Sequence, residues 1–254
     1  EDKIGRRAIR VTDLYEPKLF SEKLESNLDY YNFLLVNYYG KNALDYSRIY
    51  EQSLACGERL RPMVGNTEKI LFEAIEAGKN VLLEGAQGSL LDIDHGTYPF
   101  VTSSNTTIGG CLSGTGLNAQ NIGTVVGISK AYCTRVGEGP FPTELRDETG
   151  QRLAEFGHEF GSTTGRPRRC GWLDIVALRR ACRLNGIESI CLTKLDVLDS
   201  FEEVKICVDY MPERSEVGLT NAQNNFDPKG SKISSPKNSA RFSKWSSPPS
   251  IAAT

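Results

Sequence analysis

Residues 173–195 read LDIVALRRACRLNGIESICLTKL, a helix pattern followed at once by a strand pattern. Apolar side chains between positions 173 and 184 recur at spacings of three and four, which is typical of an amphipathic helix. Asn185-Gly186 gives that helix a stop signal. Residues 189–195 (SICLTKL) then read as a buried strand, and residues 204–210 (VKICVDY) as another.

The same alternation extends toward the N-terminus. Apolar residues between positions 19 and 34 recur at helical spacing. Thr67–Ala77 predicts a second helix with Ile70, Leu71 and Ile75 facing inward. We expect short strands at Val81–Leu83 and at residues 125–129, with 132–136 extending the latter. Strands that alternate with helices predict an α/β fold with a mainly parallel central sheet flanked by helices.

The composition divides the chain near Met211. Residues 1–211 carry the apolar patterns and are expected to form one domain. Residues 212–254 are rich in Ser, Pro, Asn and Lys. Such a segment buries too little apolar surface to offset its ordering entropy. We therefore expect 212–254 to be a disordered tail.

Bulk composition narrows the class of protein. The net charge of −2 does not favour a nucleic-acid partner, and no apolar run approaches the length of a membrane span. The seven cysteines form no C-x-x-C pair, so neither a metal site nor a disulfide framework is expected in this chain. Reduced cysteines favour a cytoplasmic location.

The densest polar segment directly follows the predicted strand at Val81–Leu83. It runs EGAQG (84–88), DIDHGT (92–97) and TSSN (102–105). A strand that ends in a glycine-punctuated polar loop is how α/β proteins build ligand sites. A plain surface loop is the alternative, but it does not explain the density of hydrogen-bonding groups. In either case Asp94 and His95 read as orienting groups rather than catalytic ones.

A second segment, GSTTGRPRR (161–169), sets three hydroxyls between glycines and follows them with arginines. Guanidinium groups have the fork geometry that suits a carboxylate or a phosphate. We therefore predict a loop that grips an anionic substrate. The alternative is an arginine cluster that faces acidic side chains of the same protein.

A third segment, TKLD (193–196), ends the predicted strand. A carboxylate at Asp196 can accept two hydrogen bonds from a guanine edge while the stem of Lys194 lies on the base. Alone, this pattern is most often a polar strand end. No G-x-x-x-x-G-K-[ST] loop occurs in the sequence, and the glycine-rich residues 109–116 give only a weak phosphate-loop signal. Either the phosphate loop lies outside this chain or the nucleotide interpretation is wrong.

Four segments in this order, EGAQGSLLDIDHGTYPFVTSSNTT, TRVGEGPFPTEL, GSTTGRPRRCGWLD and LTKLDVLD, resemble adenylosuccinate synthetase over about residues 1–211. The resemblance implies a ligase of purine biosynthesis with an incomplete P-loop-like, GTPase-related architecture. It implies GTP-dependent joining of IMP and L-aspartate through a 6-phosphoryl-IMP intermediate, with Mg²⁺ as cofactor. It also implies a cytoplasmic homodimer.

The resemblance also assigns site residues by motif. Gln87 would stabilise charge on the purine 6-oxygen, and Arg6 would reach the IMP phosphate of a neighbouring subunit. The IMP contacts are Arg6, Gln87, Thr102 and Arg166; the aspartate contacts are Val136, Ser162, Thr163, Thr164, Gly165, Arg166 and Arg168; the GTP contacts are Arg168, Lys194, Leu195 and Asp196.

The sequence also departs from the family pattern. The family's G-D-E-G-K-G-K loop, with its catalytic base and Mg²⁺ ligand, does not occur, nor does the histidine that acts as general acid. We therefore expect this chain alone to be inactive or nearly so. A non-catalytic nucleotide-binding or regulatory protein is the alternative function. A damaged reading frame is a third interpretation.

Overall fold

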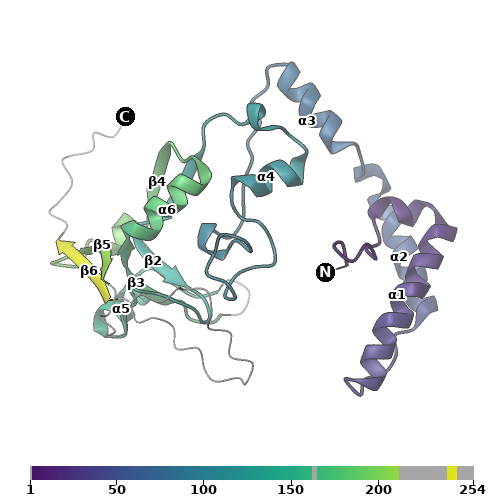
Figure 1. Cartoon of the computed structure of the whole chain (residues 1–254), viewed down its shortest axis with the longest axis horizontal. Helices are drawn as coiled ribbons and strands as arrows, with labels where there is room; N and C mark the ends of the chain where they lie inside the picture. Colours follow the sequence, from purple (N-terminus) through teal and green to yellow (C-terminus); the bar gives the residue numbers. More distant parts are fainter. Residues whose placement is uncertain (1, 162–164, 212–238, 245–254) are drawn as a thin grey trace, which may run out of the picture. The chain divides into compact units, whose positions relative to one another are not determined.

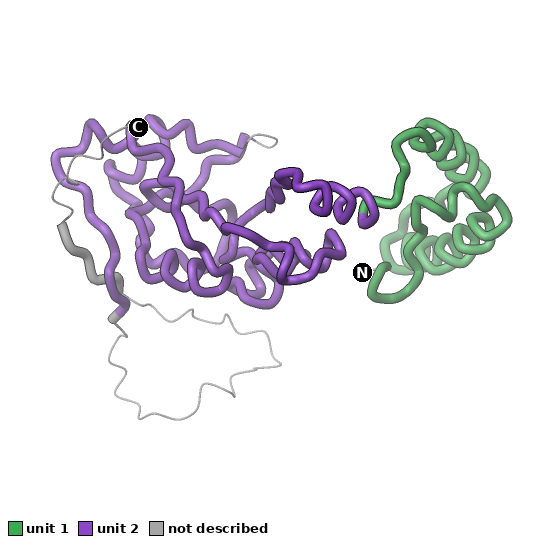
Figure 2. Tube along the Cα trace, turned by 90° about the horizontal axis from the view of Figure 1, so that it is seen from above, with its two compact units in different colours: residues 1–67 green, residues 68–254 purple. Residues whose placement is uncertain are grey.

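The computed structural model describes residues 2–161, 165–211 and 239–244. The chain forms two compact units, residues 1–67 and residues 68–254 (Figure 2). The sequence did not predict this boundary, because residues 1–211 read as a single domain.

The first unit is helical and has its own small core. It contains η1 (Val11–Tyr15), α1 (Pro17–Asn37), α2 (Tyr46–Leu60) and η2 (Arg61–Met63). Phe20, Leu24 and Leu28, spaced four apart along α1, are buried. This spacing puts them on one face of the helix, as the sequence pattern predicted.

Helix α3 (Thr67–Glu76) forms where it was predicted. Of its three expected inward residues, Leu71 and Ile75 are half-buried, whereas the expectation for Ile70 is wrong, since it is 58% exposed. The strand predicted at Val81–Leu83 is also wrong. These residues are not assigned to a strand, and Leu82 is 89% exposed. A strand needs a hydrogen-bonded neighbour, and none of the described strands pairs with this segment.

The rest of the second unit alternates strands with helices, and Figure 1 shows α6 running beside β4. Within the described residues, no helix is long and apolar enough to cross a membrane. The elements in chain order are η3 (Ser89–Leu91), α4 (Ile108–Thr115), η4 (Ala119–Asn121), β1 (Val126–Lys130), β2 (Tyr132–Arg135), α5 (Glu148–Phe156), β3 (Arg169–Asp174), α6 (Ile175–Asn185), β4 (Ser189–Thr193), η5 (Leu195–Leu198), β5 (Lys205–Met211) and β6 (Ser239–Lys244).

The predicted α/β class is confirmed. Strands β1 and β4 pair in parallel, and β3 and β5 form a parallel pair at the centre of the sheet β2-β3-β5-β6. The edge strands β2 and β6 pair antiparallel with their neighbours. Helices α5 and α6 pack against β3 and β5 respectively.

The chain changes sheets between β1 and β2. Lys130 pairs with Thr193 of β4, whereas Tyr132 pairs with Trp172 of β3. Only Ala131 lies between them, and its N–H donates to the Thr193 carbonyl at 2.9 Å. One short segment therefore joins the two sheets and fixes the position of the carboxyl end of β1.

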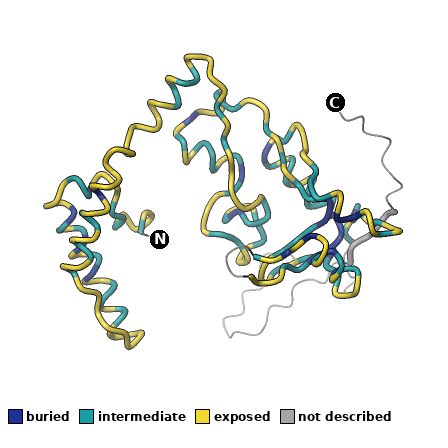
Figure 3. The backbone as a smooth tube through the Cα atoms, turned by 180° about the vertical axis from the view of Figure 1, so that it is seen from behind, coloured by how far each residue is buried: buried dark blue, intermediate teal, exposed yellow. Residues whose placement is uncertain are grey.

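The buried core of the second unit lies around this junction (Figure 3). Trp172 of β3 stacks edge-on against Phe201, with ring centroids 5.9 Å apart. The buried core residues are Ala131, Tyr132, Leu153, Cys170, Trp172, Val197 and Leu198.

Two elements differ from the sequence expectation. Strand β3 was not predicted, because its arginine and glycine read as a continuation of the basic loop. Residues 109–116, taken as a weak phosphate-loop signal, instead form most of α4, which ends at Gly116 in the left-handed conformation, φ 78°. These glycines therefore lie in a helix rather than in a glycine-rich loop.

The predicted disordered tail, 212–254, lies outside the described residues except for β6. The backbone of β6 pairs antiparallel with β5, Lys205 opposite Lys244 and Met211 opposite Ser239. For these six residues the structure differs from the expectation of disorder. Pairing can order a segment whose composition alone would not.

Candidate functional site

A cavity of about 490 Å³ lies beside β1 and α6. Residues 83–91 form one wall, and residues 125–129 of and before β1 form another. Asn185 at the end of α6 joins the first of these walls to the start of α4. Its side-chain amide donates to Ser89 Oγ at 2.9 Å, and its oxygen accepts from the Ile108 N–H at 2.8 Å.

Two of the predicted IMP contacts, Gln87 and Thr102, lie on or next to the first wall, whereas the third of this unit, Arg166, lies in the basic loop. Gln87 lines the cavity and has a φ of 60°, a conformation that non-glycine residues seldom adopt. Such backbone strain is concentrated at functional positions. Thr102 lies behind the wall, where its N–H donates to the Leu91 carbonyl at 2.8 Å.

Asp92 organises the loop that supports this wall. Its side chain is fully buried and accepts hydrogen bonds from four backbone N–H groups, those of Asp94, His95, Thr106 and Thr107, at 2.6–3.2 Å. Burial tends to raise the pKa of Asp92, but these bonds outweigh it and hold the pKa well below its usual value. Asp92 is therefore a structural anchor.

The basic loop returns on itself next to β3. Phe160 and Pro167 form an antiparallel bridge, and the Gly161 N–H donates to the Arg166 carbonyl at 2.8 Å. Gly165 has a φ of 62°, which suits glycine. The predicted aspartate contacts Ser162, Thr163 and Thr164 lie outside the described residues.

Glu159 lies at the centre of a charged cluster at the base of this loop. Lys130 Nζ donates to both carboxylate oxygens at 2.7 Å. Tyr132 Oη donates at 2.5 Å and Arg168 Nη1 at 2.8 Å. Burial tends to raise the pKa of Glu159, but the hydrogen bonds from Lys130, Tyr132 and Arg168 outweigh it, so the pKa is lowered. The cluster joins the end of β1 to the start of β3.

The residues predicted to bind guanine, 194–196, contact the same turn through Lys194. Lys194 has a φ of 61°, and its Nζ donates to the Gly157 carbonyl at 2.7 Å. Leu195 is 41% exposed. Asp196 is exposed and lines a cavity of about 360 Å³ together with Phe156 and His158. The turn at residues 157–159 therefore hydrogen-bonds to two of the residues predicted to bind GTP, Lys194 and Arg168.

The alternative interpretation of the arginines as partners of acidic side chains is correct for two of them. Arg168 bonds Glu159, and Arg169 forms a two-pronged pair with Glu144 at 2.6 and 2.7 Å. Arg169 also donates to the carbonyls of Gly137 and Gly139, which fixes the loop after Val136. Val136, a predicted aspartate contact, is 53% exposed.

Arg6 belongs to the first unit and is exposed, with a φ of 58°. Its guanidinium donates to the Ile4 carbonyl at 3.1 Å. Its predicted contact with the IMP of a neighbouring subunit stays a prediction.

Sequence reasoning missed Lys130, Tyr132, Glu159 and Asn185. Glu159 carried one usable signal, as the acidic residue nearest to a loop with three arginines. Lys130 and Tyr132 carried none, because only the change of sheets at Ala131 brings them to Glu159.

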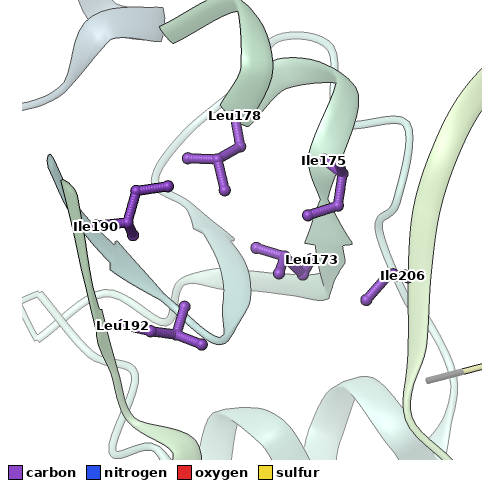
Figure 4. Close-up of a pocket in the computed structure, with 6 residues that line it drawn as sticks. All are labelled: Leu173, Ile175, Leu178, Ile190, Leu192 and Ile206. Atoms are coloured by element: carbon purple, nitrogen blue, oxygen red, sulfur yellow. The ribbon is translucent and has the colours of Figure 1, made fainter. Parts of the chain in front are cut away.

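A further cavity, of about 410 Å³, lies between α6, β3, β4 and β5 (Figure 4). Its lining is aliphatic, so it offers no polar group to orient a substrate. The lining residues are Leu173, Ile175, Leu178, Ile190, Leu192 and Ile206.

The comparisons with known proteins agree on one family. A family model for adenylosuccinate synthetase matches residues 1–236, further than the resemblance at 1–211 suggested. The adenylosuccinate synthetase of Nitrosomonas eutropha is 59% identical over 216 residues, 85% of this chain and 50% of that protein. That of Xylella fastidiosa strain 9a5c is 56% identical over 225 residues, 88% of this chain and 52% of that protein.

A solved structure of fully ligated adenylosuccinate synthetase from Plasmodium falciparum is 37% identical. It superposes with a TM-score of 0.82 and covers 96% of this chain and 56% of that one. The chain spans about half the length of the curated relatives it matches. On this sequence and structural evidence, the chain belongs to the adenylosuccinate synthetase family.

Proposed function

We propose that this chain contributes to the GTP-dependent ligation of IMP and L-aspartate to adenylosuccinate, a step of purine biosynthesis. Family membership carries the proposal. Two hydrogen bonds support it: Arg168 donates to Glu159 and Lys194 donates to the Gly157 carbonyl, so two residues assigned to GTP by motif contact the same turn at residues 157–159.

The proposed reaction has two steps. IMP loses its N1 proton while its 6-oxygen attacks the terminal phosphorus of GTP, and GDP leaves. The amine of aspartate then displaces the phosphate at carbon 6 and loses a proton, which gives adenylosuccinate and inorganic phosphate. Gln87 would stabilise the negative charge that develops on the 6-oxygen.

The substrate contacts are assigned as follows. Thr102 and Arg166 join Gln87 at IMP, and Arg6 reaches the IMP phosphate across a homodimer interface. Aspartate is held by Val136, Gly165, Arg166 and Arg168, together with residues 162–164. Asp196 accepts the two N–H groups of the guanine edge, with Lys194 and Leu195 beside the base.

The proposal extends to cofactor, location and activity. Mg²⁺ is expected from the family, but among the described residues no group of three His, Cys, Asp or Glu side chains is placed to hold a metal. We therefore assign no step to the ion. The seven free cysteines favour a cytoplasmic location. Because the sequence has no phosphate-loop motif, we propose that the chain alone turns over little or no substrate.

Nucleotide titration tests the proposal. We expect GTP to bind the wild-type chain more tightly than ATP in calorimetry, and Asp196→Asn to weaken GTP while it improves xanthosine triphosphate. An asparagine amide can donate to the 2-oxo group of xanthine, which a carboxylate cannot. Equal binding of GTP and ATP would refute the guanine assignment.

A turnover assay separates the enzyme from the non-catalytic alternative. The sequence favours that alternative in one respect, since it keeps the pocket walls without a phosphate-loop motif. Phosphate release that depends on IMP, GTP and aspartate together would contradict the proposed inactivity of the chain alone. The assay is then repeated after the remaining half of a related enzyme is added to this chain. Tight nucleotide binding without turnover in that mixture would favour a regulatory role.

A further inference from the structure

The turn after α5 is built so that Glu159 faces inward. The His158 N–H donates to the Glu155 carbonyl at 3.2 Å, and the Glu159 N–H donates to the Ala154 carbonyl at 2.9 Å. This pair of bonds, with His158 left-handed at a φ of 50°, is a Schellman end to the helix. The backbone at the end of α5 therefore fixes the position of Glu159 independently of its side-chain contacts.

The backbone also ties Glu159 to Arg168 directly. The Arg168 N–H donates to the Glu159 carbonyl at 2.9 Å, and the next residues inward, Phe160 and Pro167, form the bridge at the neck of the loop. Main-chain and side-chain bonds thus join the same two residues. One guanidinium nitrogen of Arg168, Nη1, donates to Glu159. The Arg168 side chain is 30% exposed.

The positive charges in the cluster around Glu159 outnumber the negative one. Glu159 brings one negative charge, and Lys130 and Arg168 bring two positive ones, all within 2.8 Å contacts. The side chains of Lys130 and Arg168 are 27% and 30% exposed, whereas that of Glu159 is 1% exposed. The cluster therefore keeps its anion inside and presents a net positive charge at the base of the basic loop.

We infer that Glu159 is a positioning residue that holds Arg168 in place for an anionic substrate group. The inference rests on the proposed function, which assigns Arg168 to GTP and aspartate. A held guanidinium loses less rotamer entropy when its ligand binds, and this makes binding tighter. Gly157, two residues before Glu159, accepts a hydrogen bond from Lys194 at its carbonyl, so the same turn orients Arg168 and Lys194.

A double-mutant cycle on GTP affinity tests the inference, with calorimetry on the full chain. The variants are Glu159→Gln, Arg168→Met and the pair together. If Glu159 acts through Arg168, we expect each single variant to weaken GTP binding by about 10-fold or more. The double variant should then be no weaker than Arg168→Met alone, because a residue that acts through another has no effect once that other is gone.

Asp13→Asn is the matched control. Asp13 is also a buried carboxylate paired with a lysine, Lys23 at 2.7 Å, but it lies in the first unit. We expect it to lower the melting temperature without a coupled change in GTP affinity. If Glu159→Gln does not fold, Glu159→Asp takes its place in the same cycle, because it keeps the charge and shortens the side chain by one methylene.

The outcomes separate the two ideas. Glu159→Gln that binds GTP like wild type, or losses that multiply in the double variant, would overturn the inference while the proposed function stands. A wild-type chain that binds no GTP, or an Arg168→Met variant that binds it normally, would overturn the proposed role of Arg168 and the inference with it.

Discussion

Two carboxylates of the second unit, Asp92 and Glu159, are almost equally buried, at 0% and 1% exposure, yet they are stabilised in different ways. Asp92 accepts only backbone N–H groups, from within its own loop. Within the described part of the chain, the Glu159 carboxylate accepts from side-chain donors: Lys130 of β1, Tyr132 of β2 and Arg168, which directly precedes β3. The first arrangement fixes the path of a backbone. The second fixes cationic side chains, which are the groups that can contact a ligand.

The largest effect is expected at Asp92. Asp92→Ala would leave four backbone N–H groups, one buried and three part-buried, without their acceptor, and each unsatisfied donor is costly. We expect a loss of about 4 kcal/mol in the free energy of unfolding, measured by urea denaturation. A loss below about 1 kcal/mol would show that water replaces the carboxylate, and that the loop is not anchored there.

Gly96 probes the same anchor without removing a charge. A Cβ at this position would lie 2.4 Å from the Asp92 carbonyl oxygen and 2.5 Å from that of Leu90. We expect Gly96→Ala to cost about 2–3 kcal/mol, because rigid backbone atoms must move. Gly88→Ala is the control, since a Cβ there meets nothing within 4 Å. Equal melting temperatures for the two variants would contradict the close approach.

Glu159→Ala should be milder than Asp92→Ala. Breaking a buried pair leaves an uncompensated charge, but Lys130 and Arg168 are 27% and 30% exposed and can turn toward water. We expect a loss of about 2 kcal/mol in the same denaturation experiment. If Glu159→Ala instead costs more than Asp92→Ala, the cluster is mainly structural and the contrast between the two carboxylates fails.

The smallest and most specific effect concerns pH at Glu144, a carboxylate bound by charged donors near the surface. Hydrogen bonds from Arg169 lower its pKa from 4.5 to about 2, against the effect of burial. A lowered pKa in the folded state adds stability above about pH 4.5, which is lost as the pH falls toward 2.

The stability difference between wild type and Glu144→Gln should therefore be full at pH 7 and shrink between about pH 4.5 and 2. Urea midpoints measured across that range check this. A difference that does not change with pH would mean that Glu144 is held by something other than its charge.

Much of the fold followed from local pattern. The periodicity of residues 173–184 and the Asn185-Gly186 stop predicted α6, which ends at Asn185 with Gly186 left-handed. The patterns at 189–195 and 204–210 predicted β4 and β5. Strand β3 was missed because its sequence, RCGWLD, contains an arginine and a glycine and shows no alternation of apolar and polar residues. The strand expected at 81–83 failed for the opposite reason, since its apolar run has no paired neighbour in the described chain.

The sequence by itself determined the family, the α/β class, the elements α6, β4 and β5, and the residues that motifs assign to IMP, aspartate and GTP. Those features are written in neighbouring residues, because periodicity and motif spacing are local properties of the chain. Only the tertiary structure decided that Glu159 meets Lys130, 29 positions away, and that Asn185 reaches Ser89, 96 positions away. Such contacts depend on which strands become neighbours, and the pairing of β1 with β4 and of β2 with β3 settles that only once the chain has folded.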